Sequence, residues 1–292
     1  WWWDGKKMNE PWIFDTGRIH VNAKNNHEYV VPLWKDSSVW GHDADSNQFW
    51  FDILGHKLKP GPSNLQIIVN PEKNYLGKLT HHKNKFSEAY GYDIIRLRRA
   101  PFRALLDGEI RSGTAYLQKV TVDAPPIPWF WGTIHLYDGT YIDWFIPHIG
   151  GSMLRRSERP WSVLGRAAQY PIRPAGLLIR PIDNLHQSFS DVSIELEKSS
   201  ILDPNRNKDS LPKFTITCIS GRIKMRIIAK AAGRAAWVFN QKSLGGIKSH
   251  LTYNEYPLNV ESIVIEDYTG YSKYNSEDIL GGNAEHAWGF LF

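Results

Sequence analysis

The chain has 292 residues, of which 42% are hydrophobic, 22% charged and 13% aromatic, and its formal net charge is +5 at pH 7. A chain of this length buries a large core without disulfides or metal ions, which indicates one to two globular domains. The single Cys218 excludes an intrachain disulfide framework. With no visible signal peptide, this favours a reducing compartment such as the cytoplasm, while a secreted protein without disulfides is the alternative. No run of about 18 apolar residues occurs, so no integral membrane span is expected.

The basic residues fall into two clusters rather than one long stripe. Arg96, Arg98, Arg99 and Arg103 form the first cluster, and Arg155, Arg156 and Arg159 form the second. These clusters fit a solvated face or a surface for anionic partners. Because no recognised nucleic-acid motif accompanies them, no nucleic-acid partner is predicted.

Helical periodicity is almost absent, and the best helix candidate is the short segment Trp161–Gln169. Strand-like runs bounded by turn residues are frequent instead, which predicts an all-β antiparallel sandwich or barrel. The runs are Gln48–Leu54, Leu65–Val69, Ile94–Leu97, Ala115–Val122, Trp129–Tyr137, Tyr141–Ile146, Leu177–Arg180, Val192–Leu196, Phe214–Ile219, Ile223–Ala229, Ala235–Asn240, Ser249–Tyr253 and Ser262–Glu266.

The composition changes in the middle of the chain. The segment from Gly150 to Pro181 is rich in Gly, Pro and Arg and poor in strand signals. We interpret it as a central crossover between two β units. The predicted domains are therefore residues 1–155 and 156–292.

The segment from Pro125 to His148 carries more potential site chemistry than any other. Asp138-Gly139 predicts a two-residue type I′ hairpin turn, which would place Tyr137 opposite Thr140. One face would then carry Trp129, Trp131, Thr133, His135, Ile142, Trp144, Ile146 and His148. The other would carry Phe130, Gly132, Ile134, Leu136, Tyr141, Asp143 and Phe145. Since neither face is simply polar, the hairpin is expected to belong to a sheet wrapped around a cavity.

Three hairpin residues are candidates for chemistry in this register. Asp143 would lie among apolar side chains, which raises the pKa of a carboxyl and suits it to donate a proton. The alternative is that it pairs with a buried Arg. His135 and His148 would contact a ligand beside Trp131 and Trp144, or would simply satisfy backbone carbonyls.

The C-terminal segment GGNAEHAWGFLF is the second dense candidate site. Alternation puts Glu285 on one face and His286 with Trp288 on the other. Glu285 is the second candidate proton donor, His286 a further catalytic candidate, and Trp288 a candidate ligand contact. A terminal strand that closes a barrel would explain the apolar positions equally well.

Several short blocks resemble one known family. They are the aromatic opening Trp1–Trp3, then Gly113–Tyr116, Trp129–Gly132 and the Asp138-Gly139 turn. In these blocks the chain resembles the carotenoid 1,2-hydratase (hydroxyneurosporene synthase) family, whose relatives include a fungal phytoalexin hydratase and fungal Diels–Alderases. The resemblance implies two lipocalin-like β units. Gln118 stands where relatives often carry His or Asn soon after the Tyr, and we include it among the candidate ligand contacts.

The leading hypothesis is a cofactor-independent enzyme, a hydratase (lyase) or a cyclase, that acts on an isoprenoid or polyketide-like molecule. Asp143, Glu285 and His286 are its catalytic candidates. Its candidate ligand contacts are Gln118, Trp129, Trp131, His135, Trp144, His148 and Trp288. The alternatives are a carrier of an apolar ligand without turnover and a carbohydrate-active β-protein. No metal is predicted, since His81-His82 is expected in a loop and no metal-ligand spacing recurs.

Overall fold

The computed structural model describes residues 28–34, 38–43, 48–53, 65–69, 79–85, 91–106, 108–123, 127–150, 169–203, 206–242 and 248–291. Trp1–Trp3, the second arginine cluster and most of the helix candidate lie outside the described residues. Gln169, the last residue of that candidate, begins a strand.

The described residues form an all-β structure, which confirms the predicted fold class. Every strand pair within these ranges is antiparallel. The helical elements among them are two short 3₁₀ turns, η4 (Pro181–Asp183) and η6 (Ser276–Asp278). None of the described helices is long and apolar enough to cross a membrane.

Contacts between residues divide the chain into two compact units, and the described strands that follow Asp123 all belong to the second. Strand pairing determines this division, because the aromatic hairpin pairs with strands from the C-terminal half of the chain. The predicted first domain, residues 1–155, contains the hairpin, and the bounds 1–155 and 156–292 stay a prediction.

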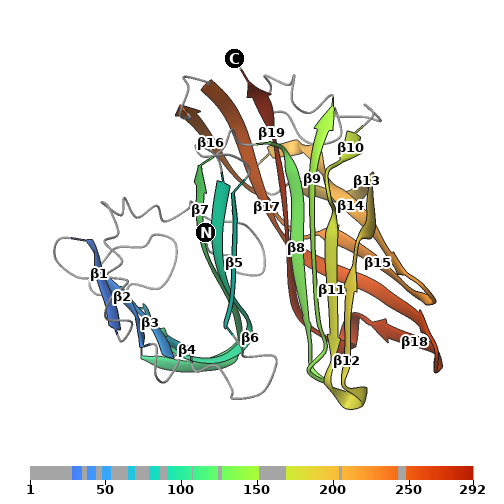
Figure 1. The fold of residues 1–292 in the computed structure, drawn as a ribbon, viewed down its shortest axis with the longest axis horizontal. Coiled ribbons are helices and arrows are strands. Elements are labelled where there is room, and N and C mark those ends of the chain that lie inside the picture. The colour runs from blue at the N-terminus through green and yellow to red at the C-terminus, as the bar shows by residue number, and fades with distance from the viewer. Residues whose placement is uncertain are drawn as a thin grey trace. The chain divides into compact units, whose positions relative to one another are not determined.

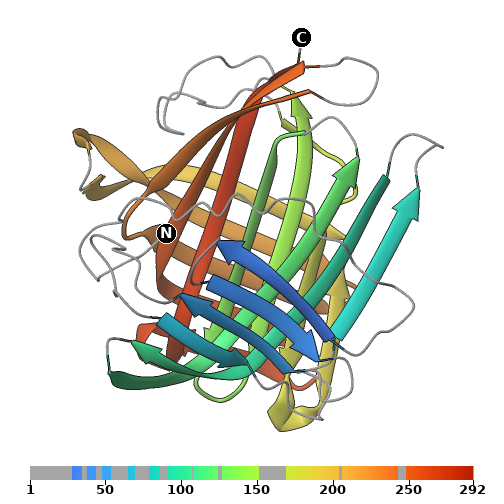
Figure 2. The ribbon, with the colours of Figure 1, turned by 90° about the vertical axis from the view of Figure 1, so that its left-hand side faces the viewer.

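The first unit is a seven-stranded sheet in the order β1-β2-β3-β4-β6-β5, with β7 paired to β6. Figure 2 shows β1 to β4, coloured blue to light blue, side by side in this sheet. The strands are β1 (Glu28–Trp34), β2 (Ser38–Asp43), β3 (Gln48–Ile53), β4 (Leu65–Val69), β5 (Leu79–Lys85), β6 (Gly91–Leu106) and β7 (Glu109–Asp123). The expected loop at His81-His82 is wrong, since both residues lie in β5 and pair with β6.

A β-bulge interrupts the pairing of β6 with β7. Leu97 pairs with Leu117 and Ala100 with Ala115, so Arg98 and Arg99 together lie opposite one residue of β7. Arg99 has a positive φ of 43°. A bulge bends its strand, and here it separates the half of β6 that pairs with β5 from the half that pairs with β4.

The second unit is one twelve-stranded sheet that is not closed by hydrogen bonds. Its main path is β12-β11-β9-β8-β19-β17-β15-β14-β13, and β10, β16 and β18 pair at its margins. The strands are β8 (Trp129–Leu136), β9 (Tyr141–Gly150), β10 (Gln169–Pro171), β11 (Ala175–Arg180), β12 (Leu185–Phe189), β13 (Asp191–Asp203), β14 (Arg206–Ser220), β15 (Ile223–Ala231), β16 (Ala235–Lys242), β17 (Lys248–Asp267), β18 (Gly270–Asn275) and β19 (Ile279–Leu291). Figure 1 labels them along the chain.

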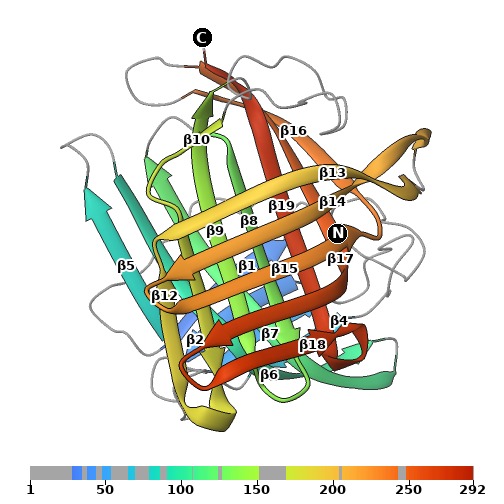
Figure 3. The same cartoon turned by 90° about the vertical axis from the view of Figure 1, so that its right-hand side faces the viewer.

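The long strand β17 lets this sheet turn over on itself. Its first half pairs with β16 and β19, and its second half pairs with β15 and β18. The prediction of two separate strands in this segment is therefore wrong. Figure 3 shows β13, β14 and β15 crossing in front of β8, β9 and β19.

The apolar core lies between these two layers of the second unit. β8, β9 and β19 contribute one side of it, including Phe130, Ile134, Trp144 and Ala284. β14 and β15 contribute Phe214, Ile216, Cys218, Met225 and Ile227, all fully buried. We call the surface of β8, β9, β17 and β19 that carries Phe130, Trp144 and His286 the core face. Cys218 is a buried strand thiol, as its alternating context predicts.

Candidate active site

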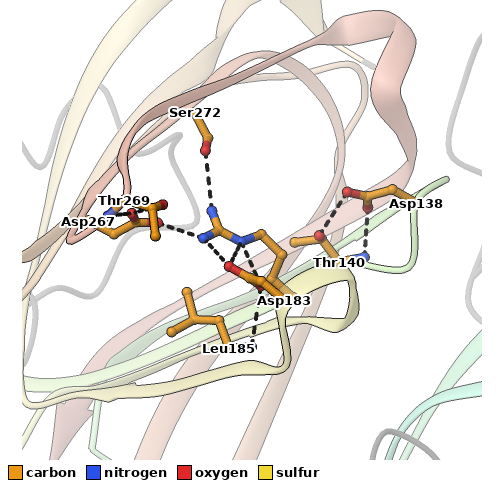
Figure 4. A network of polar contacts seen from close by, with 8 residues as sticks. Asp138, Thr140, Asp183, Leu185, Asp267, Thr269 and Ser272 are labelled. Carbon is orange, nitrogen blue, oxygen red and sulfur yellow. Dashed lines mark hydrogen bonds and ion pairs between the residues drawn. The ribbon is translucent and has the colours of Figure 1, made fainter.

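The turn of the aromatic hairpin fixes the register of every candidate residue on β9. Leu136 N donates to Thr140 O at 2.9 Å, and Gly139 N donates to Leu136 O at 3.2 Å. The loop therefore has three residues, with Gly139 at a positive φ of 97° in the bulge position. Asp138 accepts hydrogen bonds from the Thr140 backbone N–H and hydroxyl, at 2.8 and 3.1 Å (Figure 4). The hairpin is confirmed, but the two-residue turn is wrong.

One additional loop residue moves the whole of β9 to the opposite face, because side chains alternate with a period of two. The structure pairs Trp131 with Phe145, Thr133 with Asp143, and His135 with Tyr141. The predicted faces are therefore wrong for β9. Its residues Tyr141, Asp143 and Phe145 share a face with Trp129, Trp131 and His135. Its residues Ile142, Trp144, Ile146 and His148 share the core face with Phe130.

The face opposite the core carries three carboxyl side chains. β17 pairs with β19 so that Glu255 lies directly opposite Glu285, and Glu285 lies opposite Trp131 on β8. In the next row, Asn283, Thr133 and Asp143 follow one another across β19, β8 and β9. We call this surface the carboxyl face. The correct register thus brings both predicted proton donors, Asp143 and Glu285, to one side of the sheet.

Of the carboxyl groups on the carboxyl face, Glu285 is the best suited to donate a proton at neutral pH. Its side chain is partly buried and accepts a hydrogen bond from Trp129 Nε1 at 3.1 Å. Burial and the charge of Glu255 raise the pKa of Glu285 to about 7, while hydrogen bonds from Tyr253 and Trp129 oppose the increase. A carboxyl with this pKa holds its proton in a large fraction of molecules at neutral pH.

The side chains around Glu285 come from β8, β17 and β19. Burial raises the pKa of Glu255, and the Asn283 side chain, which donates to Glu255 Oε1 at 3.0 Å, opposes this increase. Burial and the two glutamates also raise the pKa of Tyr253. The rings of Tyr253 and Trp129 lie 6.0 Å apart.

Asp143 has a mixed environment rather than the apolar one expected from the predicted register, since Leu177 lies opposite it on β11 and Thr133 on β8. The Oδ2 atom of Asp143 accepts a hydrogen bond from the Tyr141 hydroxyl at 2.9 Å. His135 contacts the Tyr141 ring edge-on at 5.2 Å and is buried. Asp143 is therefore hydrogen-bonded by Tyr141, whereas Glu285 is hydrogen-bonded by Trp129 and lies opposite Glu255.

The remaining predicted residues of this unit occupy the core face. His286 is fully buried, stacks on Phe130 at 4.0 Å and meets Trp288 edge-on at 4.8 Å. His148 also stacks on Phe130, with ring centroids 4.8 Å apart, and its Nδ1 lies 3.2 Å from the carbonyl oxygen of Ile146. Burial lowers the pKa of His148 to about 4, so its ring is neutral at pH 7. Trp144 is also buried there.

The candidate residues thus separate into two groups on opposite faces of one sheet. Trp129, Trp131, His135, Asp143 and Glu285 lie on the carboxyl face. Trp144, His148, His286 and Trp288 lie on the core face and cannot contact the same ligand atom as the first group. Gln118 belongs to the first unit, where it is exposed and accepts hydrogen bonds from Arg96 and Tyr116.

Sequence reasoning missed Glu255 and Tyr253. The predicted strand Ser249–Tyr253 ended two residues before Glu255, because Pro257 interrupts the apolar pattern. The alternation of Tyr253 and Glu255 in the same run was the available signal. Among the described residues, no group of three or more His, Cys, Asp or Glu side chains is arranged to hold a metal ion.

No protein-family model and no curated protein matches this sequence. Among solved structures, a protein assigned as AttH from Nitrosomonas europaea aligns with a TM-score of 0.45 and 11% identity, over 89% of this chain and 69% of that chain. Kievitone hydratase from Nectria haematococca aligns with a TM-score of 0.31 and 9% identity, over 90% of this chain and 85% of that chain. These similarities are too low to assign the chain to a family, so the family resemblance stays a prediction.

Proposed function

We propose that the protein is an enzyme that transfers a proton from Glu285 to an apolar small molecule and thereby hydrates or cyclises it. The observation that carries the proposal is the position of Glu285, opposite a second carboxyl and among aromatic rings. A general acid works best when its pKa lies near the working pH. The pKa of Glu285, about 7, meets that requirement.

The chemistry needs an acid and a base on the same side of the sheet. In the hydration, Glu285 transfers its proton to one carbon of an alkene and leaves a carbocation on the other. Water adds its oxygen to that carbon, and Asp143 accepts the proton that the water loses. A proton returned from Asp143 to Glu285 through solvent completes the cycle, so that the net change is addition of one water molecule. In a cyclisation, a second double bond of the substrate replaces water as the nucleophile, and the carbocation left by ring closure loses a proton to Asp143 and forms a new double bond.

The aromatic side chains of the carboxyl face suit a cationic intermediate. Trp129, Trp131, Tyr253 and Phe145 lie on this face with Glu285. Their ring faces are electron-rich and attract a cation, most strongly in the case of Trp. An isoprenoid or polyketide-like substrate fits this face because it is apolar and carries double bonds.

The test replaces the acid without changing its shape. Glu285→Gln is expected to lower turnover by at least about 10²-fold, because the amide cannot donate a carboxyl proton. The assay incubates a panel of isoprenoid and polyketide-like alkenes in heavy-oxygen water and detects hydrated products by mass, and cyclised products by chromatography. Wild-type activity should fall as the pH rises through about 7, since only protonated Glu285 donates.

The matched control is Glu266→Gln, an exposed glutamate on the same strand as Glu255. It should leave turnover unchanged. Full activity of the Glu285→Gln variant would show that another group supplies the proton. Tight binding of the alkenes with no turnover by the wild type would favour the carrier function instead.

One observation favours a second candidate, a carbohydrate-active enzyme. Retaining glycosidases use two carboxyl groups about 5–5.5 Å apart, and Glu255 and Glu285 place two carboxyl groups on directly opposite residues of one face. Trp129 and Trp131 on the same face could stack on a sugar ring. Release of nitrophenol from aryl glycosides, abolished by either Glu→Gln change, would support this function over hydration.

A further inference from the structure

We propose that Glu255 and Glu285 share a single proton, and that Glu255 is the positioning residue that keeps this proton on the pair at neutral pH. The role of this proton in catalysis rests on the proposed function, since the shared proton is the one that Glu285 would donate. Its physical basis is the geometry of the two strands, which is independent of any substrate.

The antiparallel register makes Glu255 and Glu285 direct neighbours on one face of the sheet. Glu255 on β17 and Glu285 on β19 are direct partners, with Tyr253 facing Ala287 in the adjacent row. Like charges directly opposite each other destabilise a sheet. When two carboxyl groups occupy one site, one of them retains a proton, and the two titrate as a pair.

The described side chains that hydrogen-bond the pair are neutral donors. Glu285 receives hydrogen bonds from the Trp129 indole and the Tyr253 hydroxyl. Glu255 receives one from the Asn283 amide. The described residues next in register are Trp131 on β8 and Ala235 on β16, neither of which titrates. Neutral donors orient the carboxyl oxygens but leave the repulsion between the two charges in place.

This arrangement gives the two glutamates different roles. Glu285 lies centrally, between β17 and β8, and is opposite Trp131. Glu255 lies one strand further away and is anchored by Asn283. Glu285 is therefore the group that reaches toward the aromatic side chains of β8, while Glu255 acts on it through its charge.

The experiment follows the titration of Glu285 directly. The side-chain carboxyl carbons are observed by NMR in protein labelled with carbon-13 glutamate, and the resonance lost in Glu285→Gln identifies Glu285. In the wild type its midpoint is expected near pH 7. Burial, the largest cause of the raised pKa, persists in Glu255→Gln, so the midpoint should fall measurably but stay above the ordinary 4.5, because only the like charge is removed. Glu266→Gln should leave it unchanged.

A reciprocal measurement covers the case in which Glu255→Gln fails to fold. Coupling between two sites is mutual, so Glu285→Gln must lower the titration midpoint of Glu255 by a similar amount. A wild-type midpoint for Glu285 near the ordinary 4.5, or midpoints that do not respond to the partner substitution, would overturn the shared proton. Coupled midpoints in a protein with no turnover on any substrate would retain it and reject only the proposed function.

Discussion

At the scale of single residues, Gly132 is required because a neighbouring ring occupies the space of its side chain. It pairs with Trp144 across β8 and β9 on the core face. A Cβ atom added to Gly132 would lie 2.1 Å from Cζ2 of the indole. Trp144 is 1% exposed and fixed by the core around it, so the ring has little room to move away.

Gly132→Ala is therefore expected to lower the free energy of unfolding by about 1–3 kcal/mol, the usual cost of overpacking a core. Gly281→Ala is the matched control, since a Cβ there meets nothing within 4 Å. It should change the free energy by less than about 0.5 kcal/mol. Urea unfolding followed by Trp fluorescence measures both, and equal unfolding midpoints for the two variants would contradict the close approach of Trp144.

At the scale of elements, the hairpin shows what a sequence pattern specifies and what it does not. Asp138-Gly139 correctly predicts a turn, because Gly139 must adopt a positive φ. The dipeptide is compatible with both two- and three-residue loops, and only tertiary pairing selects between them. Tyr137 N donates to Asp278 O, a contact from η6 that no local pattern reveals. The sequence pattern did not specify whether the loop has two or three residues. That one-residue shift in register determines on which face of the sheet Asp143 lies.

A buried ion-pair network joins three other elements of the same unit (Figure 4). Arg180 at the end of β11 lies 2.6 Å from both Asp183 in η4 and Asp267 at the end of β17. Asp267 also accepts hydrogen bonds from the Thr269 N–H and hydroxyl. These Thr269 bonds and the Arg180 guanidinium hold the pKa of Asp267 at about 2. The Arg180 and Asp267 side chains are only 5% and 4% exposed.

Arg180→Met is expected to destabilise the protein by about 3–5 kcal/mol, because it leaves the buried Asp267 carboxylate without its cation. Arg226→Met on β15 is the control, since Arg226 is exposed, and should change the free energy of unfolding by less than about 0.5 kcal/mol. Thermal unfolding by calorimetry at pH 7 compares them. Equal transition temperatures would mean that the network contributes no more than a surface arginine.

At the scale of the whole molecule, local patterns predicted the fold class but not how the strands combine. Alternating runs such as Ile223–Ala229 identify strands, because each buries one face. Neither the continuity of β17 through Pro257 nor its change of partners could be predicted, since both depend on contacts between distant segments. The same long-range pairing brings Glu255 to Glu285 and places the aromatic hairpin in the second unit.

One consequence of the two faces is that a single sheet holds two titrating groups with opposite effects on stability. The pKa of Glu285 is raised from 4.5 to about 7, so the folded protein holds this proton more tightly and loses stability as the pH rises through that range. The pKa of His148 is lowered from 6.5 to about 4, so the unfolded chain takes this proton first. The stability that neutral His148 provides is complete above pH 6.5 and is lost as the pH falls through 4.

Between pH 4.5 and 6.5 these two contributions have opposite slopes, each up to about 1.4 kcal/mol per pH unit, and largely cancel in the wild type. Glu285→Gln removes the contribution of Glu285, so the free energy of unfolding of this variant should rise with pH across this window. His148→Phe keeps a ring against Phe130 and removes the other, so its free energy should fall with pH. Urea unfolding at half-unit pH intervals measures both slopes. The opposed slopes follow from a partly buried acid on the carboxyl face and a buried base on the core face. Parallel pH profiles for the two variants would therefore show that the pKa values of Glu285 and His148 are not shifted in opposite directions.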